Sequence, residues 1–392
     1  MNVEWFLLLL PLAALSGWLS ARAHYKQQHR SPKNTFNPEY FKGLNFLLNE
    51  QPDKAIDVFI KLLEVNSETV ETHLALANLF RRRGETDRAI RIHQNLIARP
   101  TLTHLQRDQA LVELGLDYMN AGVLDRAESL FLELLSKPSP PIQAYKQLLR
   151  IYQQEKNWHQ AIEMAKNIQN IKPDEMASTI AQFYCELATQ YLNTKHKAFD
   201  FLKQAKKHDP DCVRAMLLEA DLYITAHNYR NALKSLLVIE QQNYLYIAEA
   251  LPQLLLCYQQ LNKLPAFEQW LQALLKRHPN LTSARLMLTH IIQLQHGSQA
   301  AQDYLYEQLH SYPSVEGLHT LISLGAPSNS VLVPLIRDIT STMIHHGDRY
   351  TCQHCGFSGK TMHWHCPSCK QWGTIKPTEI HLSSLETLLE SH

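Results

Sequence analysis

The 392-residue sequence has little glycine, a residue that destabilises helix interiors, and its positive and negative charges nearly cancel. It contains 12 glycines, and 38 lysine and arginine residues balance 37 aspartate and glutamate residues, for a net charge of +1. The balance excludes a global basic field that would attract nucleic acid. The scarcity of glycine, beside abundant leucine, alanine and glutamine, favours an all-α chain. This length predicts about two or three domains with ample core material.

Common catalytic motifs are also absent. The sequence has no phosphate-binding glycine loop, no Gly-x-Ser-x-Gly elbow and no His-Glu-x-x-His zinc helix. The 21 histidines are scattered along the chain without pairing to carboxylates at a common site. We therefore predict a protein that is not an enzyme, with no catalytic residues and no organic cofactor.

Cysteine is rare outside one C-terminal segment. Cys185, Cys212 and Cys257 lie far apart in apolar helical contexts, where buried, reduced thiols are expected. The other four form two Cys-x-x-Cys turns with 10 residues between them: Cys352, Cys355, Cys366 and Cys369. Such turns bring four thiolates around one cation at about 2.3 Å each, a site favoured by zinc or a single iron. We predict one structural metal ion, iron or zinc, in a module at residues 348–378; two disulfides are the weaker alternative.

A short apolar run opens the chain. Residues 3–19 are apolar except for Glu4 and Ser16, and basic residues follow. About 17 to 25 residues cross a bilayer as a helix. We therefore predict a single-pass anchor at residues 1–20 and a basic linker at residues 21–35. The positive-inside rule places the N-terminus in the periplasm and the body on the cytoplasmic side. A secretory signal is the alternative, because Ala21-Arg-Ala23 resembles a cleavage site, although a signal carries its basic residues before the apolar run.

From residue 36 to residue 280 the sequence repeats with the tetratricopeptide period. A small residue opens each predicted second helix at intervals of 34, 38, 34, 37, 34 and 34 residues: Ala55, Ala89, Ala127, Ala161, Ala198, Ala232 and Ala266. Residues 281–347 hold a degenerate eighth repeat, with Ala300 at the same position, and capping helices; residues 379–392 form a tail. The predicted fold is an all-α tetratricopeptide solenoid, with the metal-binding module closing its end and docked through Phe357, Trp364 and Trp372.

The run Arg81-Arg-Arg83 is part of the densest positive cluster in the array. Favourable charge at a helix C-terminus, before the turn at Gly84, explains the run without any partner. Because the first helices of tetratricopeptide proteins line the concave groove, Asn78, Arg81 and Arg82 are also candidates for partner contacts.

Five segments carry a resemblance to a known family. They are Gly43-Leu-Asn-Phe-Leu-Leu48, Asn78-Leu-Phe-Arg-Arg-Arg-Gly-Glu-Thr-Asp-Arg-Ala-Ile-Arg-Ile-His-Gln94, Phe183-Tyr-Cys-Glu-Leu-Ala188, Cys257-Tyr-Gln-Gln-Leu261, and Trp364-His-Cys-Pro-Ser-Cys369 continuing to Thr374-Ile-Lys-Pro377. With the anchor, the array and the cysteine turns, the chain resembles the bacterial lipopolysaccharide assembly protein B family along essentially its whole length.

The resemblance implies a membrane-anchored protein of the cell inner membrane whose metal is bound by the four cysteines of the two turns. It also implies that the chain helps the FtsH-type membrane protease to degrade UDP-3-O-acyl-N-acetylglucosamine deacetylase, the enzyme that commits precursors to lipid A. The implied partners are this protease, the deacetylase, other lipopolysaccharide assembly proteins and the inner membrane. Nucleic acid is not among them, and self-association as a homo-oligomer stays open.

Two other functions use the same parts of the chain. A scaffold would gather lipopolysaccharide synthesis and assembly proteins at the membrane without proteolysis. A rubredoxin-like electron carrier would use the same four ligands, but the segment between the turns is much shorter than in rubredoxin. Lys370 also stands where the second turn usually has glycine. The lack of a basic stripe around the cysteines disfavours a nucleic-acid-binding ribbon.

Overall fold

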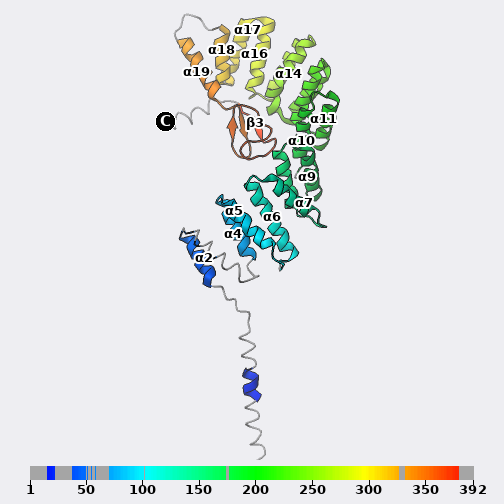
Figure 1. Cartoon of the computed structure of the whole chain (residues 1–392). Coiled ribbons are helices and arrows are strands. Elements are labelled where there is room, and N and C mark those ends of the chain that lie inside the picture. Colours follow the sequence, from blue (N-terminus) through cyan, green and yellow to red (C-terminus); the bar gives the residue numbers. More distant parts are fainter. Residues whose placement is uncertain are drawn as a thin grey trace, which may run out of the picture. The chain divides into compact units, whose positions relative to one another are not determined.

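A computed structural model describes residues 16–22, 38–49, 51, 54, 58, 70–100, 102–173, 176–325 and 332–378 (Figure 1). The chain divides into two compact units, Met1–Val123 and Leu124–His392. Residues 16–20 of the predicted anchor and residues 21–22 of the predicted linker are helical. The rest of the anchor, residues 23–35 of the linker and the predicted tail at 379–392 lie outside the described residues. No helix in the described ranges has both the length and the apolar character needed to cross a membrane.

The described part of the first unit is helical. It contains α2 (Pro38–Leu48), α4 (Val70–Arg82), α5 (Thr86–Ile97) and α6 (His104–Asn120), and the last three contact one another. Gly84, with a φ of 82°, makes the turn between α4 and α5, a conformation that glycine adopts without a steric penalty. Thr103 and Gln106 form a capping box at the start of α6, which satisfies backbone N–H groups that have no partner within the helix.

The second unit continues the helical array. Its helices are α7 (Leu124–Leu135), α8 (Ile142–Gln154), α9 (Trp158–Ile171), α10 (Ala177–Gln190), α11 (Lys195–His208), α12 (Val213–Thr225), α13 (Tyr229–Asn243), the 3-10 turn η2 (Tyr244–Tyr246), α14 (Ile247–Gln260), α15 (Leu264–Arg277), α16 (Thr282–His296), α17 (Ser298–Ser311), α18 (Val315–Gly325) and α19 (Leu332–His346). Helices adjacent in sequence contact each other, and from α10 to α18 each first helix also contacts the first helix of the next pair, as α10 contacts α12. The predicted tetratricopeptide-type repeat is confirmed.

The repeat register is confirmed over most of the array and corrected near its end. In the described repeats, the fourth residue of each second helix is fully buried: Ala89, Ala127, Ala161, Ala198 and Ala232, then Phe267 and Ala301. The predicted Ala55 lies outside the described residues. The predicted Ala266 is exposed and Ala300 only partly buried. The shift arises because α14 has 14 residues where α12 has 13, so α15 begins one residue later. The expectation of a small residue at the start of the second helix fails in α15, because Phe267 occupies the buried position.

Three short strands follow the array. They are β1 (Tyr350–Cys352), β2 (Ser358–Gly359) and β3 (Ile375–Pro377), in an antiparallel sheet of order β2-β1-β3. Thr351 pairs with Ser358 on one side and with Lys376 on the other. The small hydrophobic core of this C-terminal module contains Cys352, Cys366 and Ile375. Because so small a core gives little stability by itself, a metal site is the expected source of the remainder.

Candidate metal centre

The four predicted ligands lie together. The Sγ atoms of Cys352, Cys355, Cys366 and Cys369 are all within 4.8 Å of one another. Two Sγ pairs, Cys352 with Cys369 and Cys355 with Cys366, are 3.8 Å apart. A tetrahedron with metal–sulfur bonds of about 2.3 Å has edges of about 3.8 Å, so the cluster has the size that one zinc or iron ion requires. The donor set and its dimensions fit one metal ion bound by four cysteines.

Equivalent backbone turns hold the two halves of the site. The amide of Gly356 donates to the Cys352 carbonyl at 3.0 Å, and the amide of Lys370 donates to the Cys366 carbonyl at the same distance. Gly356 has a φ of 73° and Lys370 a φ of 58°. Lysine therefore adopts the left-handed conformation that glycine has in the first turn, at a cost of about 1 to 2 kcal/mol. The departure from the usual glycine does not change the turn.

Neighbouring donors prepare two of the sulfurs for metal binding. The Thr374 hydroxyl lies 3.3 Å from Cys352 Sγ, and its hydrogen bond lowers the pKa of the Cys352 thiol to about 6. The backbone N–H of Phe357 lowers the pKa of Cys355. A hydrogen bond to the thiolate favours the charged form, which is the form that binds metal.

Trp372 attaches the module to the array of the second unit. Its indole N–H donates to Gln153 Oε1 at 3.4 Å. Its ring meets Trp158 and Phe183 edge to face, with centroids 6.0 and 5.7 Å away. Edge-to-face pairs add about 0.5 to 1.5 kcal/mol beyond the burial of apolar area. Trp372 therefore contacts α8, α9 and α10 and attaches the metal-binding module to these three helices.

Trp364 makes the second aromatic contact. Its ring stacks on Tyr246 at 5.6 Å, and the Arg214 guanidinium lies 5.9 Å from its centroid. The predicted docking roles of Trp364 and Trp372 are confirmed. Phe357 instead packs within the module, beside His363, so the predicted docking role of Phe357 is wrong.

Two tyrosine hydroxyls complete the attachment. Tyr246 donates to the Ile375 carbonyl at 2.8 Å, and Tyr350 donates to Glu249 Oε1 at 2.7 Å. Burial and Glu249 raise the pKa of Tyr350 to about 12, so this donor keeps its proton at neutral pH. These contacts lie on η2 and α14, and the strands stand beside the helices of the array in Figure 1. The module thus docks along the array at α8 to α14, and our prediction that it closes the end is wrong.

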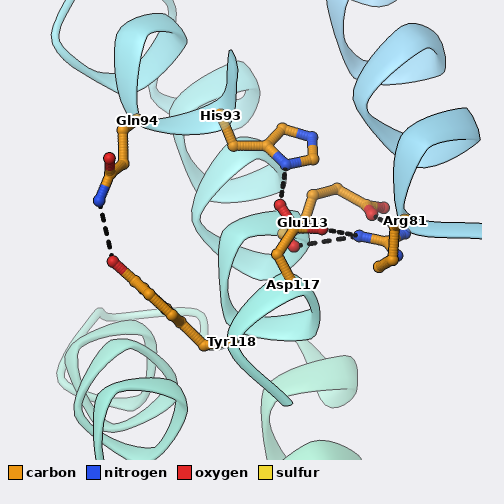
Figure 2. Close-up of polar contacts among 6 residues, drawn as sticks. All are labelled: Arg81, His93, Gln94, Glu113, Asp117 and Tyr118. Carbon is orange, nitrogen blue, oxygen red and sulfur yellow. Dashed lines mark hydrogen bonds and ion pairs between the residues drawn. The ribbon is translucent and has the colours of Figure 1, made fainter. Parts of the chain in front are cut away.

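The three predicted partner contacts lie on α4 in different environments. Arg81 bonds Glu113 Oε2 at 2.6 Å and Asp117 Oδ1 at 2.9 Å, and its side chain is 14% exposed (Figure 2). Asn78 is half-buried and Arg82 is exposed. The Arg81 guanidinium is therefore engaged within the chain, where it joins α4 to α6. Arg82 as a partner contact stays a prediction.

Sequence reasoning missed the residues that receive the module. Gln153, Trp158, Phe183 and Tyr246 lie more than 100 residues before the tryptophans or strand that they contact. They occupy ordinary helix positions, and no local pattern distinguishes them from core residues.

Comparison with known proteins agrees with this structure. A model of a rubredoxin metal-binding domain matches residues 350–377, and a tetratricopeptide repeat model matches residues 72–104. Lipopolysaccharide assembly protein B of Escherichia coli K12 is 39% identical over 384 residues, which cover 96% of this chain and 98% of that protein. The Haemophilus influenzae protein of the same name is 37% identical over 393 residues, with the same coverage.

A solved tetratricopeptide repeat protein from Parabacteroides merdae is 14% identical, with a TM-score of 0.33, over 70% of this chain and all of that one. On the strength of the near-complete match to the first two relatives, the chain belongs to the lipopolysaccharide assembly protein B family.

Proposed function

We propose that this protein is a non-enzymatic adaptor that regulates lipopolysaccharide synthesis at the inner membrane. In this role it presents the deacetylase of the committed step of lipid A synthesis to an FtsH-type membrane protease. The observation that carries the proposal is the match over 96% of the chain to proteins named for lipopolysaccharide assembly. Two further matches lie within the array and the metal module, at residues 72–104 and 350–377.

The physical form of the second unit supports a binding role. Tetratricopeptide arrays present extended surfaces on rigid helices, and such surfaces bind other proteins. Here the metal module occupies part of the array through Trp364, Trp372 and two tyrosine hydroxyls. A partner would therefore meet a composite surface of helices and module. This explains how a structural metal could matter to an adaptor that performs no chemistry.

The N-terminal run supports a membrane location in this proposal, with the N-terminus in the periplasm and the body in the cytoplasm. Attaching two proteins to one membrane replaces a dilute encounter with a high effective concentration, a gain of about 100-fold to 10,000-fold when geometry permits. Weak contacts between the array and the deacetylase would then suffice for presentation to the protease.

A pulse-chase of the deacetylase tests the proposal. In cells that lack this protein, the half-life of the deacetylase should lengthen, and the full chain should restore it. A chain without residues 1–34, expressed at native level, should fold and bind metal yet fail to restore turnover, whereas a foreign membrane-spanning helix in place of residues 1–20 should rescue it. An unchanged half-life in the deletion strain would reject the proteolytic adaptor and favour the scaffold.

A further inference from the structure

Two buried thiols of the second unit form a pair. Cys185 on α10 and Cys212 before α12 have their Sγ atoms 3.9 Å apart, and the two residues are 0% and 3% exposed. They are 27 residues apart in sequence. The third cysteine of the array, Cys257 on α14, is also buried but has no thiol neighbour among the described residues. The chain therefore holds both a thiol pair and a matched single thiol.

The two members of the pair differ in character. Cys212 is the N-cap of α12, with Arg214 two residues later. The hydrogen bond from Cys185 and the backbone N–H of Ala215 lower the pKa of Cys212, whereas burial raises the pKa of Cys185. Arg214 is paired with Glu186 at 2.8 Å and lowers the pKa of Cys212 less than Asp209 raises it, so the hydrogen bonds from Cys185 and from the helix N-terminus are what favour the thiolate. Two neighbouring thiols of which one ionises more readily than the other can form a disulfide after oxidation.

The pair lies directly beneath the docked metal module. Gln182 Nε2 lies 3.7 Å from Cys212 Sγ, and the same nitrogen would be 3.9 Å from a Cβ placed on Gly373 of the module. Arg214 reaches Gln182 Oε1 at 3.4 Å and also covers the Trp364 ring. Gln182 therefore lies between Cys212 and Gly373 of the module, and a movement of Cys212 Sγ changes the contacts of the Gln182 amide.

We propose that Cys185 and Cys212 are a redox modification site, and that a reversible disulfide between them loosens the metal module from the array. The oxidant is a small peroxide. The Cys212 thiolate attacks one peroxide oxygen and the O–O bond breaks, which leaves a sulfenic acid and, after protonation, water. Cys185 sulfur then attacks the Cys212 sulfur, the S–O bond breaks, and a second water leaves with the Cys185 proton. The two thiols supply two electrons and peroxide accepts them; a dithiol reverses the reaction by exchange.

The geometry also predicts how oxidation affects docking. A disulfide has an S–S length of about 2.05 Å, so closing the present 3.9 Å gap requires a combined sulfur movement of about 2 Å. Cys212 Sγ then moves away from Gln182 Nε2, and the Gln182 amide, which lies beside Gly373, loses its hydrogen bond to sulfur. Because both thiols are buried, peroxide reaches them when the module lifts locally, and weaker docking should therefore speed the oxidation.

The test uses the full-length, metal-loaded protein. It is exposed to limiting hydrogen peroxide, its free thiols are alkylated, and its peptides are analysed by mass spectrometry. A crosslink between the peptides that carry Cys185 and Cys212 should appear, and dithiothreitol should reverse it while Cys257 stays alkylated. In Cys185→Ala, Cys212 should be trapped as a sulfenic acid by dimedone. Oxidation of Cys257 at the same rate, or release of metal before any crosslink forms, would overturn the proposal.

Hydrogen exchange provides the second readout. Backbone amides of residues 364–377 should exchange faster in the oxidised protein than in the reduced protein, and peroxide should not change them in Cys185→Ala. Trp372→Ala should speed crosslink formation by about tenfold or more, since the population of the opened form controls access. Cys257→Ala should behave as the unmodified protein. Equal exchange in the oxidised and reduced proteins would overturn the proposed link to docking.

Discussion

Asp117 connects three helices of the first unit, and replacing it should destabilise them strongly. The carboxylate has no solvent exposure; it accepts from Arg81 at 2.9 Å and from His93 Nδ1 at 2.5 Å (Figure 2). Asp117→Ala leaves the half-buried Arg81 guanidinium with Glu113 alone and leaves the fully buried His93 without its acceptor. Removing one partner of a buried ion pair costs about 3 to 5 kcal/mol. Because Glu113 still faces Arg81, we expect a value near the lower end, about 3 kcal/mol.

Hydrogen exchange of peptides from α4 to α6 is the appropriate assay, since a single melting temperature is not well defined for a chain with two units. A loss of about 3 kcal/mol should speed exchange in these helices by about 100-fold, at about 1.4 kcal/mol for each factor of ten. Peptides from the second unit serve as the internal control. They should exchange as in the unmodified protein.

Two matched variants make the prediction refutable. Glu113→Ala removes a carboxylate that is 18% exposed and bonds only Arg81, so it should cost less than Asp117→Ala. Arg82→Ala removes an exposed guanidinium and should change stability by less than about 0.5 kcal/mol. Equal effects of Glu113→Ala and Asp117→Ala would refute the reasoning that Asp117 is the centre of the network. Loss of function in Arg81→Ala would report stability, whereas loss in a stable Arg82→Ala would report a partner contact.

Four further predictions follow from the module and the array. Trp372→Ala should cost about 3 kcal/mol of docking, seen as faster exchange in residues 364–377 with unchanged metal content, because an aromatic contact is lost and a cavity remains; unchanged exchange would contradict the docking site. Cys366→Ser should remove about one metal equivalent by elemental analysis, since three thiolates bind metal far more weakly. Lys370→Gly should stabilise the metal-bound module by about 1 kcal/mol in chemical denaturation, by relieving the left-handed backbone strain. Phe267→Ala should cost about 3 to 5 kcal/mol in the thermal unfolding of the second unit, whereas exposed Ala266→Leu should be nearly neutral; the reverse order would restore the earlier register.

Local patterns were enough to predict the metal ligands and the repeat. The ligands Cys352, Cys355, Cys366 and Cys369 were predictable because a Cys-x-x-Cys turn places its two sulfurs through its own backbone, with little help from the rest of the fold. The buried positions Ala89 to Ala232 were predictable for a similar reason. Each helix pair repeats the same close approach, so the need for a small side chain recurs at almost the same interval. The family resemblance followed from these same local features.

The tertiary structure decided everything that depends on side chains meeting across long stretches of chain. Trp372 lies between Trp158 and Phe183 only because the array brings α9 and α10 to the module, and no spacing in the sequence expresses that contact. Phe267 replaced the expected Ala266 because one added residue in α14 shifts the next helix. The pairing of Arg81 with Asp117 and of Cys185 with Cys212 has the same origin. Periodicity determines which face of a helix is buried, whereas the partner on that face depends on the packing of helices distant in sequence.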